Sequence, residues 1–199
     1  MKSEKIILAS GSPRRKEILA KNGFEFEVVL PTGEEKNIVG EKYSEELVNE
    51  CAIAKAKSVA KDNAVDINKT VGASYASPVI VSCDTVVVND GIIIGKPKDV
   101  ADAARTLKSL SDKTHLVASS VCVIKGEEVK VAHEVTKVTF RELSDVEIES
   151  YINRCNPLDK AGSYGIQDDG FDFAVKMEGN IDNVMGFPMK AFLKINSIF

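Results

Sequence analysis

The sequence has no C-x-x-C motif, and it has only two histidines and four cysteines among its 199 residues. Each cysteine lies more than thirty residues from the next, at positions Cys51, Cys83, Cys122 and Cys155. This spacing argues against a zinc site and against a disulfide framework. Because all four occur in apolar or helical stretches, we expect them to pack inside a protein from a reducing compartment.

Long hydrophobic runs and excess positive charge are also missing. The N-terminal apolar stretch is four or five residues long, too short for the apolar region of a signal peptide or for a membrane span. The formal net charge of −4 argues against a general nucleic-acid or membrane-surface binder, which would normally be basic. We therefore expect a cytoplasmic protein with neither nucleic-acid nor membrane partners.

The familiar nucleotide and catalytic signatures do not occur. No Gly-Lys-Ser/Thr follows the first turn at Walker A spacing, and there is no dinucleotide fingerprint. No Ser–His or Cys–His pair is indicated, since a triad needs a nucleophile next to its base. His115 and His133 both lie in strand patterns, so we expect them to pack or to form hydrogen bonds.

The chain does contain enough hydrophobic residues, 44%, for a substantial core. Strand patterns occupy residues 5–9, 26–30, 79–88, 92–94, 115–125, 129–140 and 171–178. Helical patterns occupy residues 13–22, 44–61, 100–110, 144–153 and 188–198. Hairpin turns are expected at 89–91 and 125–128, and a capping box at Ser144 and Glu147.

Helices alternate with strands early in the chain, and long hairpins come later. This order predicts an α/β fold with a mixed sheet. Residues 62–78 are polar and poor in large apolar side chains, and we expect them to form a surface loop. The length suits one large domain, 1–199, or two closely joined lobes.

The first strand is followed by the segment Ser10-Gly11-Ser12-Pro13-Arg14-Arg15. Proline suits the first turn of a helix, whose free N–H groups and dipole attract anions. Two arginines carry the wrong charge for that dipole, unless a bound anion shares these donors. The segment therefore indicates a phosphate site, or else an ordinary strand-to-helix connection with two solvated arginines.

Three further residues suggest a charged cleft. Asp84 interrupts a nearly continuous β-branched strand, where a carboxylate is costly to bury without a partner. Asp84 either accepts hydrogen bonds from backbone amides at an irregularity in the strand, or it holds a divalent metal or a water. Lys96 lies in a proline turn that returns towards Asp84, and Lys55 lies on or beside the inward stripe of its helix. Either lysine is a solvated surface residue or an anion ligand.

Two loops have weaker signals. Glu34 and Glu35 follow Gly33 and form either an acidic surface loop or a second carboxylate for a metal. Residues 159–167 contain two glycines and end in Gln167. Glycine permits close approach to a ligand, and the glutamine amide offers both a donor and an acceptor to a base edge. An ordinary loop explains this second segment equally well.

Taken together, these segments resemble the Maf family, the septum-formation-inhibitor-like nucleoside triphosphate pyrophosphatases. The resemblance covers nearly the whole chain and rests on nine ordered segments: 8–15, 33–35, 54–56, 83–87, 95–99, 114–115, 138–141, 159–167 and 183–188. It implies an elongated mixed sheet flanked by helices, with two lobes around a central cleft. It also implies hydrolysis of the α–β phosphoanhydride of a nucleotide with Mg²⁺ or Mn²⁺.

The resemblance also assigns roles to individual residues. Asp84 falls on the position of the proton acceptor, with Glu35 and Asp84 as expected metal ligands. The expected substrate-binding residues are Ser10, Arg14, Arg15, Lys55 and Lys96. Arg14, Thr85 and Gln167 fall on positions linked to nucleotide preference, and they resemble the branch that acts on dTTP and UTP. A homodimer is suggested by the resemblance alone.

The chain departs from the family pattern at three places. Ser82 and Cys83 replace the usual small residues before Asp84, residues 62–78 are longer than typical, and Asp168 and Asp169 add negative charge near the presumed base end. These departures leave base selectivity less determined than reaction type. The alternative function is a nucleotide-sensing regulator of cell division, which needs the same cationic pocket but no water-activating carboxylate.

Overall fold

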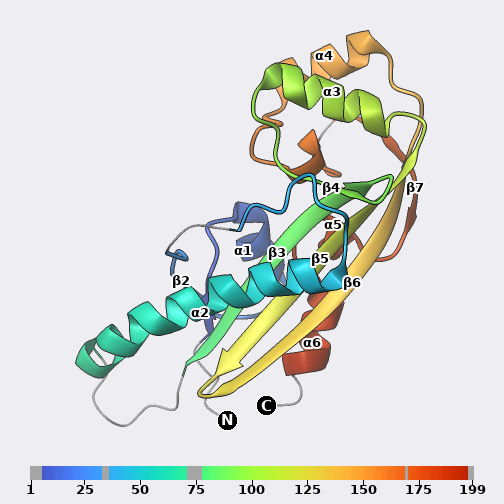
Figure 1. Cartoon of the computed structure of the whole chain (residues 1–199). Helices are drawn as coiled ribbons and strands as arrows, with labels where there is room; N and C mark the ends of the chain where they lie inside the picture. Colours follow the sequence, from blue (N-terminus) through green and yellow to red (C-terminus); the bar gives the residue numbers. More distant parts are fainter. Residues whose placement is uncertain (1–5, 33–35, 71–77, 169, 197–199) are drawn as a thin grey trace.

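The computed structural model describes residues 6–32, 36–70, 78–168 and 170–196. Seven strands form one sheet in the order β2-β1-β3-β5-β6-β7, and β4 pairs with β3 outside this path (Figure 1). The strands are β1 (Ile6–Leu8), β2 (Phe26–Val28), β3 (Val79–Asn89), β4 (Ile92–Ile94), β5 (Thr114–Lys125), β6 (Glu128–Phe140) and β7 (Ala174–Glu178). The first three pair in parallel and the remaining pairs are antiparallel, so the predicted mixed α/β sheet is confirmed.

The edge of β3 that faces β1 is interrupted. β1 pairs only with residues 79–81 of β3, and β4 pairs only with residues 87–89. Among the residues that the structure describes, no strand pairs with this edge between those two segments. The interruption, which we call the β3 gap, contains Asp84 and Thr85, and these are the only two residues of β3 that are not buried.

Helices cover both faces of the sheet. They are α1 (Pro13–Lys21), α2 (Glu45–Thr70), α3 (Val100–Leu110), α4 (Asp145–Arg154), α5 (Ile181–Val184) and α6 (Met189–Asn196), with the short 3₁₀ helix η1 (Ala161–Ser163). Ala52, Ala56 and Val59 of α2 pack on one face against Ile80 and Cys122. On the other face, α1 and α6 pack against the same part of β3 and β5.

A separate hydrophobic cluster lies at the far ends of the long strands. Leu107 of α3 and Tyr151 of α4 pack there with Val87, Val117 and Phe140. In Figure 1, α3 and α4 lie at one end of the long strands, and α1, α2 and α6 lie around the other part. The helices thus form two groups along the length of the strands, and the β3 gap lies between these groups.

Helix α2 corrects the expectation of a loop at residues 62–78. The helix continues to Thr70, because residues 62–70 contain neither glycine nor proline and the next such residue is Gly72. Residues 71–77 lie outside the described part. Although α2 is 26 residues long, neither it nor any other described helix combines the length and apolar character needed to cross a membrane.

The local turn and cap signals are confirmed. Residues 89–91 form the hairpin between β3 and β4, and Asp90 and Gly91 both have positive φ, 50° and 80°, as a two-residue hairpin turn requires. Ser144 and Glu147 form the complete capping box at the start of α4. The strand expected at 171–178 is shorter, since β7 begins at Ala174.

Candidate active site

A cleft of about 1020 Å³ opens at the β3 gap. Its walls come from the loop after β1, the middle of β3, one side of α2, the turn at Gly95 and Lys96, and the loop from Asp159 to Asp168. The ladder register explains this position, because the end of β1 leaves the middle of β3 accessible. The volume is at the upper end of the range for small-molecule sites.

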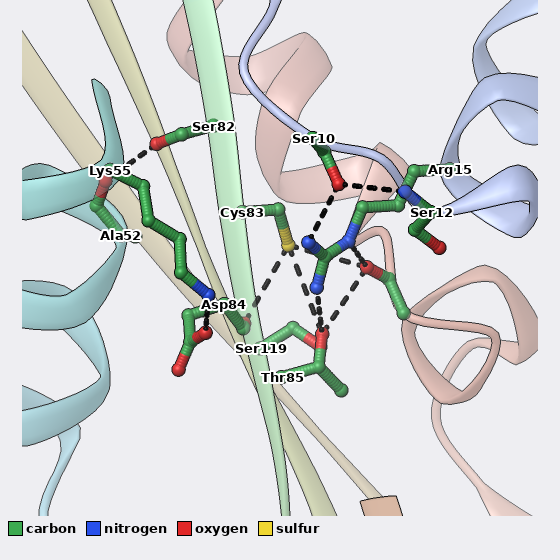
Figure 2. Close-up of polar contacts among 11 residues, drawn as sticks. Ser10, Ser12, Arg15, Ala52, Lys55, Ser82, Cys83, Asp84, Thr85 and Ser119 are labelled. Carbon is green, nitrogen blue, oxygen red and sulfur yellow. Dashed lines mark hydrogen bonds and ion pairs between the residues drawn. The ribbon is translucent and has the colours of Figure 1, made fainter. Parts of the chain in front are cut away.

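The carboxylate of Asp84 is paired with Lys55 on the α2 face of the sheet. Lys55 Nζ lies 2.5 Å from Asp84 Oδ1, and the two side chains are 13% and 15% exposed. Figure 2 shows the second carboxylate oxygen pointing away from the lysine. The expectation that Lys55 faces inward is therefore confirmed, and the carboxylate within the strand has a cationic partner.

The guanidinium of Arg15 lies on the opposite side of β3 (Figure 2). It donates to the Gly186 carbonyl at 2.8 Å, to Ser10 Oγ at 3.1 Å and to Thr85 Oγ1 at 3.3 Å. Consecutive residues of a strand point to opposite faces, so Thr85 and Asp84 diverge. Both nevertheless line the cleft, because the β3 gap exposes both faces at this point.

The hydroxyl oxygens of Ser10 and Thr85 are occupied by protein donors. Ser10 Oγ also accepts from the Ser12 amide at 3.3 Å, and the Ser10 residue is 5% exposed. The Thr85 hydroxyl donates to the Gly186 carbonyl at 3.2 Å or exchanges a hydrogen bond with Ser119 at 2.9 Å. These side chains are thus held in fixed orientations at the floor of the cleft.

Arg14 and Lys96 both line the cleft. Arg14 is half-buried and makes one long contact, 3.5 Å, to the carbonyl of Asp159. Lys96 is exposed, beside the buried Pro97. The two neighbouring arginines therefore differ: Arg15 donates to three protein acceptors, whereas Arg14 makes one long contact and lines the cleft.

Gln167 is exposed and lines the cleft, in the loop that follows η1. The next residue, Asp168, also lines the cleft, so its negative charge lies near Gln167 as expected. Its carboxylate accepts from the Tyr151 hydroxyl and lies 3.3 Å from Lys160 Nζ. This carboxylate therefore has a cationic partner, Lys160. Asp169 lies outside the described residues.

Glu35, the second expected metal ligand, also lies outside the described residues, as does Glu34. Within the described ranges, no three His, Cys, Asp or Glu side chains gather as they would in a metal cage formed by protein alone. Mg²⁺ is commonly held by one or two carboxylates together with substrate phosphates and water. Asp84, in a cleft lined by cationic side chains, fits that simpler donor set.

The cysteines and histidines have packing and hydrogen-bonding environments, as expected. None of the four cysteines, all of which the structure describes, forms a disulfide. Burial raises the pKa of Cys83, whose Sγ contacts the Gly186 carbonyl at 3.3 Å. His115 pairs with the Tyr164 hydroxyl at 2.7 Å. His133 bonds Tyr43 and Ser120, both at 2.8 Å.

Sequence reasoning from single residues did not find the carbonyl of Gly186. This oxygen accepts from Arg15, Cys83 and Thr85. Any residue supplies a carbonyl, so the only local signal was the glycine itself, whose φ of 100° favours that residue type. Lys36 was also missed: it lines the cleft and pairs with Glu50 at 2.7 Å.

The chain is similar to a known family and to several known enzymes along nearly its whole length. The family model described as "Maf-like protein" matches residues 5–197. A dTTP/UTP pyrophosphatase from Dictyoglomus thermophilum is 43% identical over 201 residues, covering 100% of this chain and 95% of the relative. The enzyme of that name from Dictyoglomus turgidum is 41% identical over 98% of this chain and 94% of the relative. The one from Pyrococcus furiosus is 41% identical over 96% and 94%. The chain belongs to the Maf family.

Proposed function

We propose that the protein hydrolyses the α–β phosphoanhydride of dTTP and UTP, giving the nucleoside monophosphate and pyrophosphate. The observation that carries the proposal is the Lys55–Asp84 pair in a cleft that Arg14 and Lys96 also line. The substrate class is supported by relatives named dTTP/UTP pyrophosphatase at 41–43% identity along nearly the whole chain.

In the proposed reaction, a water oxygen bonds to the α-phosphorus while the bond from that phosphorus to the bridging oxygen breaks. Asp84 accepts the proton from the water as a general base. The bridging oxygen leaves with pyrophosphate, and Arg14, Lys55 and Lys96 stabilise its developing charge. These roles require a carboxylate and several cations in one cleft, and the β3 gap provides them.

The floor of the cleft binds and orients the phosphates. The hydroxyl of Ser10 and the free amides at the start of α1 donate to phosphate oxygens. Arg15 adds positive charge and also holds Ser10 and Thr85 in position through its hydrogen bonds. We assign Arg14, Thr85 and Gln167 to the recognition of the nucleoside.

A divalent cation, Mg²⁺ or Mn²⁺, would be held by Asp84 and Glu35 together with substrate oxygens. When bound, it supplies positive charge that offsets the charge of the triphosphate. Asp84 then orients the substrate through the metal, activates the water, or does both. The proposal also includes a cytoplasmic location and a homodimer, the latter to be checked by light scattering of the purified protein.

The competing function is a nucleotide sensor that acts through a protein partner. Such a protein needs the cationic cleft but has no use for a general base. The deciding experiment is pyrophosphate release by the purified protein with Mg²⁺ or Mn²⁺, across normal and modified nucleoside triphosphates. The Asp84→Asn variant is measured alongside, with circular dichroism to verify its fold.

Removal of a general base typically lowers the rate by about 10²–10⁴-fold. We therefore expect release from dTTP and UTP in the wild type and a loss of that order in Asp84→Asn. Binding of nucleotide without any release would favour the sensor. A folded Asp84→Asn variant with wild-type turnover would remove Asp84 from the mechanism.

A further inference from the structure

The loop that carries Gln167 ends in a turn closed by hydrogen bonds on both sides. The Asp168 amide donates to the Gly165 carbonyl at 3.1 Å. In the other direction, the Gly165 amide donates to Asp168 Oδ2 at 3.1 Å. Gln167 is the third of the four residues in this turn, so its backbone direction is determined by the contacts of Asp168.

The carboxylate of Asp168 is anchored from beneath the turn. It accepts from the hydroxyl of Tyr151, a fully buried residue of α4, and lies 3.3 Å from the buried Lys160 ammonium. The Tyr151 oxygen also accepts from the Gly165 amide at 3.0 Å. Burial and the neighbouring Asp168 both raise the pKa of Tyr151, so the hydroxyl stays protonated and continues to donate.

These contacts divide the turn into an inner and an outer part. Ile166 packs against both of the large hydrophobic clusters, whereas Gln167 is exposed in the cleft. The Asp168 carboxylate fills the space beside Gly165, because a Cβ at Gly165 would lie 2.6 Å from Asp168 Oδ1. The contacts of Ile166 and Asp168 thus fix the backbone on either side of Gln167.

A fixed amide matters for bases that differ only in hydrogen-bond direction. Uracil presents a carbonyl acceptor at position 4 and an N–H donor at position 3, and cytosine presents a donor and an acceptor at the same positions. A Gln amide pairs with uracil in one orientation and with cytosine in the flipped one. Selecting uracil therefore requires that the amide be held against the flip.

We propose that Asp168 and Tyr151 are positioning residues that hold Gln167 in the orientation selecting uracil and thymine over cytosine. This inference rests on the proposed function of the cleft as a pyrimidine triphosphate site. Tyr151 is absent from the residues lining the cleft, so it acts only through the turn. Asp168 borders the cleft, but its carboxylate points to Tyr151 and Lys160.

The test is the ratio of kcat/KM for UTP to kcat/KM for CTP, measured in single and double variants. We expect Gln167→Ala, Asp168→Ala and Tyr151→Phe each to lower this ratio, the first two by roughly tenfold, since one hydrogen bond contributes up to about 1.5 kcal/mol. When Gln167 is already alanine, Asp168→Ala and Tyr151→Phe should change the ratio by less than about twofold.

Two controls separate positioning from general loosening of the fold. Asp168→Asn keeps an acceptor for the Gly165 amide and should restore most of the ratio lost in Asp168→Ala. Tyr43→Phe removes a comparable hydroxyl, one that bonds His133 at 2.8 Å outside the cleft, and should leave the ratio unchanged. Thermal unfolding of every variant shows which of them are folded.

Two outcomes of these measurements would overturn the proposal. A Gln167→Ala background in which Asp168→Ala still lowers the ratio by about tenfold would show that Asp168 acts independently of Gln167 and would overturn the proposal. A folded Asp168→Ala variant with the wild-type ratio would overturn it as well.

If the wild type releases no pyrophosphate from either nucleotide, the proposed function fails. The same cycle is then measured on the dissociation constants of UTP and CTP. Coupled effects on that binding ratio would sustain the positioning role without catalysis, and additive effects or no binding would overturn it.

Discussion

Lys55 Nζ on α2 lies 2.5 Å from Asp84 Oδ1 on β3, and both side chains are more than four-fifths buried. The two residues are 29 positions apart in the chain. Their ion pair connects helix α2 to the β3 gap. Because both residues line the cleft, we expect a change to the pair to affect stability and, under the proposed function, turnover. Removing either partner would abolish this ion pair.

The first prediction concerns the energetic coupling of this pair. Lys55→Met and Asp84→Asn should each destabilise the fold, and the double variant should be more stable than the sum of the single effects predicts. We expect a coupling of about 1–3 kcal/mol in the free energy of unfolding, as for contacting residues in general. Denaturant titration of the four proteins measures it, and a coupling near zero would show that the contact contributes nothing to stability.

The second prediction contrasts the two adjacent arginines. Lysine cannot reproduce the guanidinium fork, so Arg15→Lys should lose contacts with Ser10, Thr85 and Gly186 and lower the free energy of unfolding by about 1–3 kcal/mol. Arg14→Lys loses only one long contact and should stay within about 0.5 kcal/mol of the wild type.

Kinetics distinguish the same two variants. We expect Arg14→Lys to raise KM for dTTP, because it changes a residue that lines the cleft, and Arg15→Lys to lower stability and kcat together. Unfolding curves and steady-state kinetics of both variants check this contrast. Equal destabilisation of the two proteins would contradict the different environments of the two side chains.

Features with local causes were predictable from the sequence. The hairpin at residues 89–91 and the capping box at Ser144 depend on residues within three positions of each other, so their signals are complete in a short segment. Lys55 and Asp84 were also found separately, one by helical spacing and the other as a carboxylate in an apolar strand. That they contact one another required the fold.

Contacts between distant segments were not predictable. Arg15 and Gly186 are 171 positions apart, and the acceptor is a main-chain carbonyl that no residue type specifies. The partners of the Asp168 carboxylate are Tyr151 and Lys160, which the sequence does not place beside it. The end of α2 was predicted wrongly for a different reason. The polar composition of residues 62–78 suggested a loop, although residues 62–71 contain neither glycine nor proline.

The third prediction concerns acid stability and His115. Burial lowers the pKa of this imidazole from 6.5 to about 4. Between these two pH values the unfolded chain binds a proton that the folded chain does not, so stability falls as the pH falls. With 1.36 kcal/mol for each pH unit, the loss from this residue reaches about 3 kcal/mol near pH 4.

His115→Gln removes this titration while retaining a hydrogen-bonding side chain near Tyr164. The free energy of unfolding should therefore fall less steeply between pH 6.5 and 4 in the variant than in the wild type. Above pH 7 the two curves should run parallel, because the imidazole is neutral in both states there. Curves that also stay parallel down to pH 4 would mean that His115 titrates normally in the folded protein.

The last prediction compares two glycines with similar backbones. Gly162 and Gly126 have φ of 70° and 60°, so alanine strains both by about 1 kcal/mol. A Cβ at Gly162 would also lie 2.7 Å from Val87 Cγ2, whereas nothing lies within 4 Å at Gly126. Overpacking typically adds about 1–3 kcal/mol, so Gly162→Ala should be the more destabilised by that amount in denaturant titrations. Because Gly162 lies in η1, directly before the loop that carries Gln167, only its variant should also lose turnover of UTP. Equal behaviour of the two variants would refute the role of the Val87 contact.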